Sequence, residues 1–504
     1  MITDNRKYFD SSLKTAKAIY DKGLYEDCAL YLRQLATFAL YNITGYYVNW
    51  KFERLLLNLG QKIPPISPIK KESHTHHRLS ILHIATELYD IGGHTKLLIN
   101  WVKIDKDNLH TVILTRMTEN KLSTKVKEEI DTNCNPIITL EGTILERAFQ
   151  LKQIAQKYDL IILHIHPNDI IPTIAFSDPL FKTPVLFLNH ADHIFWIGIS
   201  IIDCLIQIRE SNIILDKERR GANFQMFLPI PVDNTQKKEK SLNFVKEKGQ
   251  VILLSTGSEY KYKPFGEHNF FEAAYKIVNT FENVIFFIAG VSPTCEFYQK
   301  YKHPRIICLG NVTNLKDYEE FCDIYVEGFP MASFTAMLQV SKRQKYIQLM
   351  YNPADGMKLF SDKQAYNLDY PKSFEEWFIQ LSEVIESPKI RDEKMHKQYQ
   401  YINQLYNLEK WKELLGDIYK SNKNRKHTVR NSVNFDKFYS SINELINATL
   451  LESSSKINHF NYCYKLNFFE KIKVVLRSRY KTKHVKVSKK QAMKFLFKRN
   501  ELFI

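Results

Sequence analysis

The chain has 504 residues, 44% of them hydrophobic, which is more than one hydrophobic core usually organises, so we expect two substantial domains with smaller attachments. The formal net charge is +16, but residues 461–504 alone hold 13 Lys and Arg against two acidic residues. The basic excess therefore lies in a tail, and the rest of the chain gives no reason to expect nucleic-acid binding.

Targeting, membrane and metal-binding features are not expected from the sequence. The first residues, MITDNRKYFDSSLKTAKAIY, lack the apolar core and cleavage site of a signal peptide. The longest apolar run, residues 194–206, is interrupted by Asp203 and is too short to cross a bilayer. The seven cysteines are scattered, without the paired spacing of a zinc or redox site. We therefore expect a soluble cytoplasmic protein with buried, reduced thiols and no bound metal.

Residues 1–60 are predicted to form a small helical-hairpin domain, because apolar residues recur at helical spacing on both sides of the turn DKGLYEDC. Residues 61–78 are rich in Pro and charged residues, lack an apolar period, and are expected to form a linker. Three histidines of this linker are expected to be solvated rather than bound to a metal, namely His74, His76 and His77.

From residue 79 the sequence changes to short apolar runs that end in polar residues or glycine and alternate with helical segments. Uninterrupted apolar strands that alternate with helices are typical of a parallel sheet covered on both faces. One series occupies residues 79–232, a Lys/Glu-rich connector covers 233–250, and a second series occupies 251–425. The predicted fold class is α/β, with two Rossmann-like doubly wound domains facing a cleft. Ligands of such sheets bind beyond the carboxyl ends of the strands.

Three strand ends of the first series carry candidate binding residues. Gly92 and Gly93 open a helix, where exposed N–H groups favour an anion, although two glycines also make an ordinary tight turn. Histidines at two neighbouring strand ends favour a binding site over packing. A zinc site is the competing interpretation, but neither Cys nor a carboxylate triad accompanies these histidines. The runs LIILHIHPND and PVLFLNHADH supply His164, His166, His190 and His193.

In the second series, the stretch LLSTGSEYKYKPFG has a turn at Gly257 and Ser258. Two lysines follow the turn, Lys261 and Lys263. Cations that face a glycine turn at a strand end suit a diphosphate, although lysine on a solvated loop is the commoner case.

A second strand end of this series lies in DIYVEGFPMASFTAM. The strand ends at Glu327, and Ser333 to Thr335 can cap the helix that follows. Glu327 can accept hydrogen bonds from sugar hydroxyls, while the helix start receives phosphate oxygens. The alternative is an ordinary strand-turn-helix corner with a solvated Glu.

Taken in order, these motifs resemble the GT-B glycosyltransferases over residues 79–420, in particular the retaining, nucleotide-sugar-dependent group similar to glycosyltransferase family 4. GGHTKLL is similar to the family's first glycine loop, and HIHPND to its His-x-His strand end. EGFPMASFTAM resembles the family's Glu-x7-Glu segment. The resemblance implies catalytic roles for His166 and Glu327, and a cleft or acceptor position for His164, His190 and His193. It implies donor binding by Gly92, Gly93, Gly257, Ser258, Lys263, Gly328, Phe329, Ser333, Phe334 and Thr335.

The sequence departs from the family pattern in three places. Ser258 replaces an Arg, Thr335 stands where the ribose-binding Glu is expected, and QVSKRQKYIQ lacks the usual Gly-x-Pro. SFT is similar to the Gly-Gly-Thr helix start of other GT-B transferases, including inverting ones that modify proteins. Retention and inversion therefore both stay open.

The resemblance implies metal-independent transfer of a hexosyl group, without a cofactor, from a UDP- or GDP-linked donor. The acceptor would be a hydroxyl of a surface polysaccharide, glycolipid or glycoprotein. Lys263 and the helix start at Ser333 would stabilise charge on the leaving diphosphate. A catalytically degenerate scaffold and a nucleotide-sugar epimerase on the same fold are the alternatives. The Lys-, Asn- and Ile-rich composition indicates an AT-rich bacterial genome.

Residues 426–504 are predicted to be a basic extension, in which residues 467–499 interleave apolar and basic side chains. Such an amphipathic element suits the anionic inner face of a membrane, where lipid-linked acceptors are found. A helix packed on the body with a solvated basic face is the alternative. Nucleic acid is not an expected partner, because no recognised binding module accompanies the charge.

Overall fold

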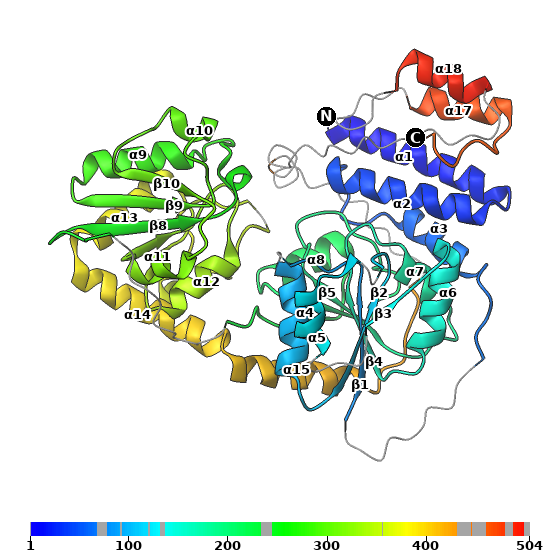
Figure 1. The fold of residues 1–504 in the computed structure, drawn as a ribbon, viewed down its shortest axis with the longest axis horizontal. Helices are drawn as coiled ribbons and strands as arrows, with labels where there is room; N and C mark the ends of the chain where they lie inside the picture. The colour runs from blue at the N-terminus through cyan, green and yellow to red at the C-terminus, as the bar shows by residue number, and fades with distance from the viewer. Residues whose placement is uncertain are drawn as a thin grey trace.

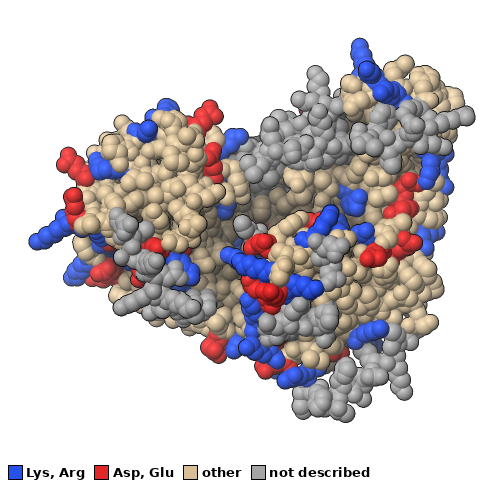
Figure 2. Space-filling model, viewed as in Figure 1, with Lys and Arg blue, Asp and Glu red and all other residues tan. Residues whose placement is uncertain are grey.

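The structure, a computed structural model, describes residues 2–67, 78–90, 93–118, 121–131, 137–232, 244–354, 356–430, 445, 460–478 and 487–497. The described chain forms two lobes, each with its own sheet, and a layer of helices lies on one of them (Figure 1). In the space-filling view the surface is hollowed between the two lobes (Figure 2). Among the described residues, no helix is long and apolar enough to cross a membrane.

The first lobe is built on seven parallel strands in the order β3-β2-β1-β4-β5-β6-β7. The apolar side chains of the central strands β1, β4, β5 and β6 are buried on both faces, as uninterrupted apolar runs predict, whereas those of the edge strands β3 and β7 are partly buried. Ala85 pairs with both Leu114 and His164, so β1, β2 and β4 end at one level and their following loops gather at one edge. The strands are β1 (Ser80–Ala85), β2 (Leu109–Leu114), β3 (Ile138–Thr139), β4 (Leu160–His164), β5 (Val185–Asn189), β6 (Cys204–Gln207) and β7 (Gln225–Phe227).

Helices between these strands cover the sheet. Thr143 and Glu146 form a capping box that begins α6, and Gly221, with a φ of 68°, ends α8 in the left-handed region. The helices are α4 (Gly93–Ile104), α5 (Thr124–Asp131), α6 (Ile144–Ala155), α7 (Ile171–Ala175) and α8 (Asn212–Arg220).

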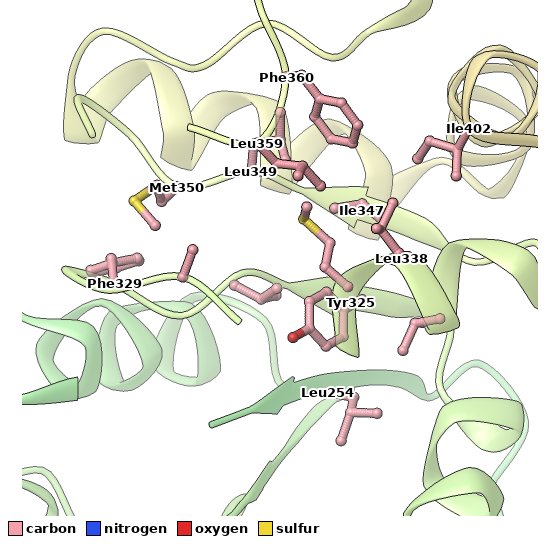
Figure 3. Close-up of a cluster of buried hydrophobic side chains, with 14 of the residues drawn as sticks. Leu254, Tyr325, Phe329, Leu338, Ile347, Leu349, Met350, Leu359, Phe360 and Ile402 are labelled. Atoms are coloured by element: carbon pink, nitrogen blue, oxygen red, sulfur yellow. The ribbon is translucent and has the colours of Figure 1, made fainter. Parts of the chain in front are cut away.

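The second lobe has five parallel strands in the order β10-β9-β8-β11-β12. They are β8 (Val251–Thr256), β9 (Val284–Ala289), β10 (Ile306–Gly310), β11 (Ile324–Val326) and β12 (Tyr346–Gln348). The helices are η2 (Glu259–Tyr262), α9 (Phe270–Thr280), α10 (Glu296–Gln299), α11 (Leu315–Phe321), α12 (Phe334–Lys342), η3 (Gln364–Tyr366), α13 (Phe374–Glu386) and α14 (Pro388–Leu405). Strand, helix and loop side chains meet in a continuous core (Figure 3). The prediction of two doubly wound α/β domains is confirmed.

The N-terminal residues form three helices, one more than the predicted hairpin: α1 (Ile2–Asp21), α2 (Tyr25–Tyr41) and α3 (Trp50–Gly60). They share one hydrophobic core with the first sheet, so they are not a separate domain. The buried Glu53 of α3 accepts hydrogen bonds from the N–H groups of Gly198 at 2.8 Å and Ser200 at 3.3 Å. A Cβ atom on Gly60 would lie 1.7 Å from Ser177 Oγ, so α3 needs glycine there to approach the first lobe.

The last helix of the predicted second domain, α15 (Leu408–Asn422), packs on the first lobe instead. Tyr419 OH accepts from Trp101 Nε1 at 2.7 Å and donates to Asp105 Oδ2 at 2.7 Å. The predicted boundary at residue 425 is therefore too late, because this polar chain and its aromatic neighbours fix α15 to α4 of the first lobe.

The described part of the C-terminal extension adds α17 (Phe468–Arg477) and α18 (Lys489–Phe497), and α17 packs on α1. The six cysteines among the described residues are buried and unpaired. The predictions for Cys134 and for His74, His76 and His77 concern residues outside those that the structure describes.

Candidate functional site

The loops after β8 and β9 meet the start of α12 with no space for side chains between them. Gly257 follows β8, and a Cβ atom on it would lie 2.9 Å from Ser333 Oγ. Gly290 follows β9 with a φ of +88°, and a Cβ atom there would lie 2.4 Å from the Gly257 carbonyl oxygen. Glycine is therefore required at position 290, and a larger residue at position 257 would force Ser333 Oγ to move. We call Gly257, Gly290 and Ser333 the glycine corner, which combines exposed backbone with a helix N-terminus, an arrangement that favours anions.

Lys261 is the cation that reaches the glycine corner. Its Nζ donates to the Ala332 carbonyl oxygen at 3.0 Å and to Ser333 Oγ at 3.1 Å, because η2 turns the chain toward α12. Burial lowers the pKa of the Lys261 ammonium, and the nearby Glu327 raises it. Lys263, which the family motif favours, has an exposed side chain just after η2. The structure therefore places Lys261 at the start of α12, and the role of Lys263 stays a prediction.

Glu327 is fully buried below Lys261, so the alternative of a solvated Glu is wrong. Its Oε2 accepts from the Met350 N–H at 2.9 Å, and its Oε1 has no hydrogen-bond partner among the described residues. Burial raises the pKa of Glu327 to about 8, although the Met350 N–H and Lys261 lower it. The side chain is therefore mostly protonated at pH 7 and behaves as a neutral acid.

Two predicted donor-binding residues that follow Glu327 are packed against aromatic side chains of the second lobe. Phe329 is fully buried, with its ring centroid 5.1 Å from that of Phe270 and 5.6 Å from that of Trp377. Figure 3 shows it within the buried cluster, so its side chain has a packing role, and its predicted part in donor binding stays a prediction. A Cβ atom on Gly328 would lie 2.8 Å from the Tyr262 ring, so glycine is required there for packing.

The first turn of α12 holds the remaining predicted donor-binding residues. Phe334 is half-buried, and Thr335 is exposed, so no carboxylate stands in this turn where the family pattern has a ribose-binding Glu. Ser258 is exposed at the start of η2, and its side chain does not cap that turn. Among these residues, the structure brings only Phe334 into contact with the first lobe, as described below.

Three histidines meet at the carboxyl edge of the first sheet. The ring centroid of His94, in α4, lies 5.4 Å from that of His166 and 4.6 Å from that of His190. Burial lowers the pKa of all three, that of His166 to about 4, so the rings are neutral at pH 7. Gly93 begins α4, and Gly92 lies outside the described residues. We call His94, His166 and His190 the histidine cluster; sequence reasoning missed His94, although it directly follows the glycine pair.

The other two predicted histidines are not members of this cluster, although His94 Nε2 binds the His164 carbonyl oxygen. His164 is fully buried, with its Nε2 3.0 Å from His83 Nδ1, and His83 Nε2 lies 2.9 Å from His110 Nδ1. His164 therefore belongs to a polar row inside the sheet and does not line the cleft, which corrects the prediction. His193 is half-buried in the loop after β5, and its Nδ1 lies 3.4 Å from Asp192 Oδ1.

Arg116, after β2, determines the tautomer of His166. Its Nη2 donates to Asn168 Oδ1 at 3.0 Å and lies 3.3 Å from His166 Nδ1. A guanidinium group has no acceptor, so His166 Nδ1 must accept and the neutral ring carries its proton on Nε2. His166 therefore has an N–H donor at Nε2 that suits a sugar or phosphate oxygen, and Nε2 is not a base.

We expect Arg116→Met to raise the pKa of His166 above about 4, because the variant removes one of the charges that oppose protonation of the ring. The variant should also allow the neutral His166 ring to carry its proton on Nδ1 as well as on Nε2. The 15N shifts of histidine-labelled protein against pH measure both, with His166→Asn to assign the signal. Arg391→Met is the control, since Arg391 binds the Val384 carbonyl oxygen in the second lobe. An unchanged His166 titration in Arg116→Met would contradict the assignment.

Arg209 connects the two sides of the cleft. It follows β6, and its Nε and Nη2 bind Asp192 at 2.7 and 2.6 Å. Its Nη1 donates to the Lys358 carbonyl oxygen at 3.1 Å, and its guanidinium carbon lies 4.8 Å from the Phe334 ring centroid. Although burial raises the pKa of Asp192, Arg209 and His193 hold it below the ordinary value. Arg209 thus fixes the histidine-bearing loop after β5 against the start of α12.

No family model and no curated protein matches this sequence. Solved structures do match the fold. An O-GlcNAc transferase mutant of Thermobaculum terrenum is 11% identical, covers 84% of this chain and 82% of its own, and gives a TM-score of 0.51. A glycosyltransferase of Rickettsia africae is 14% identical, covers 69% and 99%, and gives 0.51. TarM of S. aureus is 10% identical, covers 68% and 99%, and gives 0.50.

The chain has the GT-B fold. In this GT-B arrangement the histidine cluster and the glycine corner lie beyond the carboxyl ends of strands in different domains, and Arg209 spans the space between them. Side chains from two domains can therefore act on one ligand held between the sheets.

Proposed function

We propose that this protein is a glycosyltransferase that moves a sugar from a nucleoside diphosphate donor to an acceptor hydroxyl. The observation that carries the proposal is Lys261 at the glycine corner, where a cation, glycine turns and a helix N-terminus converge. Such a combination binds a diphosphate well, and it lies in a fold whose other domain supplies the neutral histidine cluster.

The difficult step of glycosyl transfer is departure of the diphosphate from the anomeric carbon. Negative charge develops on its oxygens as the bond breaks, and the Lys261 ammonium and the N–H groups of α12 would stabilise that charge. Lys261 donates to Ser333 Oγ at 3.1 Å, so the protein itself holds the ammonium at the glycine corner.

The opposite side of the cleft would orient the sugar and the acceptor. His166 donates from Nε2, so it would bind a sugar oxygen rather than remove the acceptor proton. His94 and His190 are neutral neighbours within ring-contact distance and are the candidates for the acceptor hydroxyl. This role for His166 differs from that of a general base.

Support for the donor comes from one structural neighbour. TarM of S. aureus forms a complex with UDP, α-GlcNAc-glycerol and fondaparinux, so that protein handles a uridine nucleotide and glycan-like molecules. We propose a UDP-linked donor first and a GDP-linked donor second. The proposed acceptor is a hydroxyl of a surface polysaccharide, glycolipid or glycoprotein in a bacterial cell.

The first experiment is a thermal-shift screen with UDP, GDP, CMP and dTDP sugars, because a ligand that binds only the native state raises the melting temperature. We expect a shift of several degrees with one nucleotide class at saturation, and loss of that shift in Lys261→Met. Product analysis with and without candidate acceptors then separates transfer from epimerisation. A scaffold that keeps the fold without turnover would give no product in either assay.

A further inference from the structure

The two described helices of the C-terminal extension form a pair that is anchored on the N-terminal helices. The ring of Phe495 in α18 stacks on that of Phe460 at a centroid distance of 4.4 Å. Arg477 Nη1 in α17 donates to Thr15 Oγ1 of α1 at 2.9 Å, and Lys465 Nζ lies 2.7 Å from an Asp27 oxygen of α2. One side of the helix pair therefore packs on α1 and α2, which agrees with the alternative prediction of a helix packed on the body.

The outer side of the pair is apolar to a degree that is unusual for a surface. Phe469 is 75% exposed, Leu476 61% and Phe497 68%, and the ring of Phe468 lies 5.9 Å from that of Phe497. Phe469 and Leu476 are seven residues apart, so they lie on one face of α17. We call the outer face the exposed hydrophobic residues of the two helices: Phe468, Phe469, Leu476, Met493 and Phe497.

The two helices that carry the outer face also carry exposed basic side chains. Residues 460–478 and 487–497 contain seven Lys and Arg and one Glu. Four of the lysines are exposed on α17 and α18, namely Lys473, Lys489, Lys490 and Lys494. Figure 2 shows basic side chains projecting where these helices lie. Aromatic side chains with surrounding lysines are complementary to an anionic lipid surface, in which the rings enter the interface and the ammonium groups meet phosphates.

We propose that α17 and α18 dock this protein on an anionic phospholipid bilayer through the outer face. The charge argues for lipid over a second copy of the chain, since two such faces carry the same sign and would repel. The binding is interfacial, with the rings of the outer face at the depth of the headgroups and the helices lying along the membrane plane.

Docking through these helices would bring the acceptor side of the cleft toward the membrane. The helix pair is carried by α1 and α2, and Thr37 Oγ1 of α2 accepts from Asn168 Nδ2 at 2.9 Å. Asn168 also binds Arg116, the partner of His166. A lipid-linked acceptor would then be concentrated on the same surface on which the protein docks. This last step rests on the proposed function, whereas the docking itself does not.

Vesicle flotation of the full chain tests the proposal without any turnover assay. We expect the protein to float with vesicles of phosphatidylcholine containing about 30% phosphatidylglycerol, and to stay at the bottom with pure phosphatidylcholine. Phe469→Ser/Phe497→Ser should reduce the floated fraction at least tenfold at equal lipid. Lys473→Glu/Lys494→Glu should do the same at low salt, since each lysine near such a surface strengthens binding by about fivefold.

Matched controls separate the outer face from general surface stickiness. Leu180 and Ile214 are each 71% exposed on the first lobe, so Leu180→Ser/Ile214→Ser removes comparable apolar surface elsewhere. Lys389→Glu/Lys397→Glu reverses two exposed charges on α14. These variants should float like the wild type. Absence of flotation by a folded wild-type protein would overturn the proposal. Equal loss in test and control pairs would also overturn it, as would a phenylalanine pair that alters only the oligomeric state in size-exclusion chromatography.

Discussion

Replacing Lys261 with methionine is expected to lower turnover by about 100- to 1,000-fold, because removal of one preorganised charge stabiliser from a transition state typically has an effect of that size. Methionine keeps much of the length and apolar character of the lysine stem, so packing around η2 should persist. The measurement is kcat with the nucleotide sugar that the thermal-shift screen identifies, together with the shift itself. Both should fall, since the same ammonium would bind the ground-state diphosphate.

Lys263→Met is the matched control, two residues away on the same stretch. Lys263 fits the family spacing, but its side chain is exposed, whereas the Lys261 Nζ lies 3.1 Å from Ser333 Oγ. We expect Lys263→Met to lose less than tenfold in kcat. The reverse order, with Lys263→Met nearly inactive and Lys261→Met nearly normal, would show that the motif spacing identifies the diphosphate ligand and that the glycine corner does not.

The second large effect is expected for Glu327→Gln on stability against pH. Burial raises the pKa of Glu327 to about 8, so the folded protein holds a proton that the unfolded chain, with an ordinary pKa near 4.5, releases. The raised pKa in the folded state contributes its full stabilisation of the folded protein below about pH 4.5. This contribution is lost as the pH rises to about 8. Glutamine cannot ionise, so the variant should overtake the wild type in that range, by roughly 4 kcal/mol at pH 8.

Denaturant unfolding between pH 5 and pH 9 measures this effect, and Glu393→Gln is the control, since Glu393 is exposed on α14. Parallel stability curves for the wild type and Glu327→Gln would refute the buried neutral acid. Turnover adds a second reading. If Glu327 is neutral at pH 7, the glutamine variant should keep turnover within a few-fold. Loss of turnover in a stable Glu327→Gln protein would indicate that the carboxylate acts as an anion.

Much of the fold follows from local sequence. Most of the uninterrupted apolar runs form buried strands, and both sheets are parallel, as expected for strands that alternate with helices. The N-terminal helices were predicted as a hairpin because helical periodicity shows that a face is buried but not which partner buries it. Only the assembled structure shows that α3 lies on the first lobe and that Glu53 is satisfied by N–H groups some 145 residues away in the chain.

The candidate site, like the fold, was predicted from the sequence only in part. The strand-end rule brought His166 and His190 to one edge, because parallel strands with aligned registers end at the same level. The rule could not separate them from His164, whose side chain is buried inside the sheet. Side chains alternate between the two faces of a strand, and the sequence does not show at which residue this alternation ends. Arg209 ends the apolar run CLIQIR, a signal of the same kind that was available but not used.

What the sequence by itself determined is the pair of doubly wound domains, the strand ends that hold functional side chains and the basic character of the C-terminal extension, since all of these depend on local apolar periodicity and composition. The tertiary structure alone decided that Lys261 contacts the start of α12, that Glu327 is buried with a raised pKa and that Arg116 lies against His166 Nδ1. These features depend on distances between segments far apart in the chain and on burial, and spacing along a sequence contains neither.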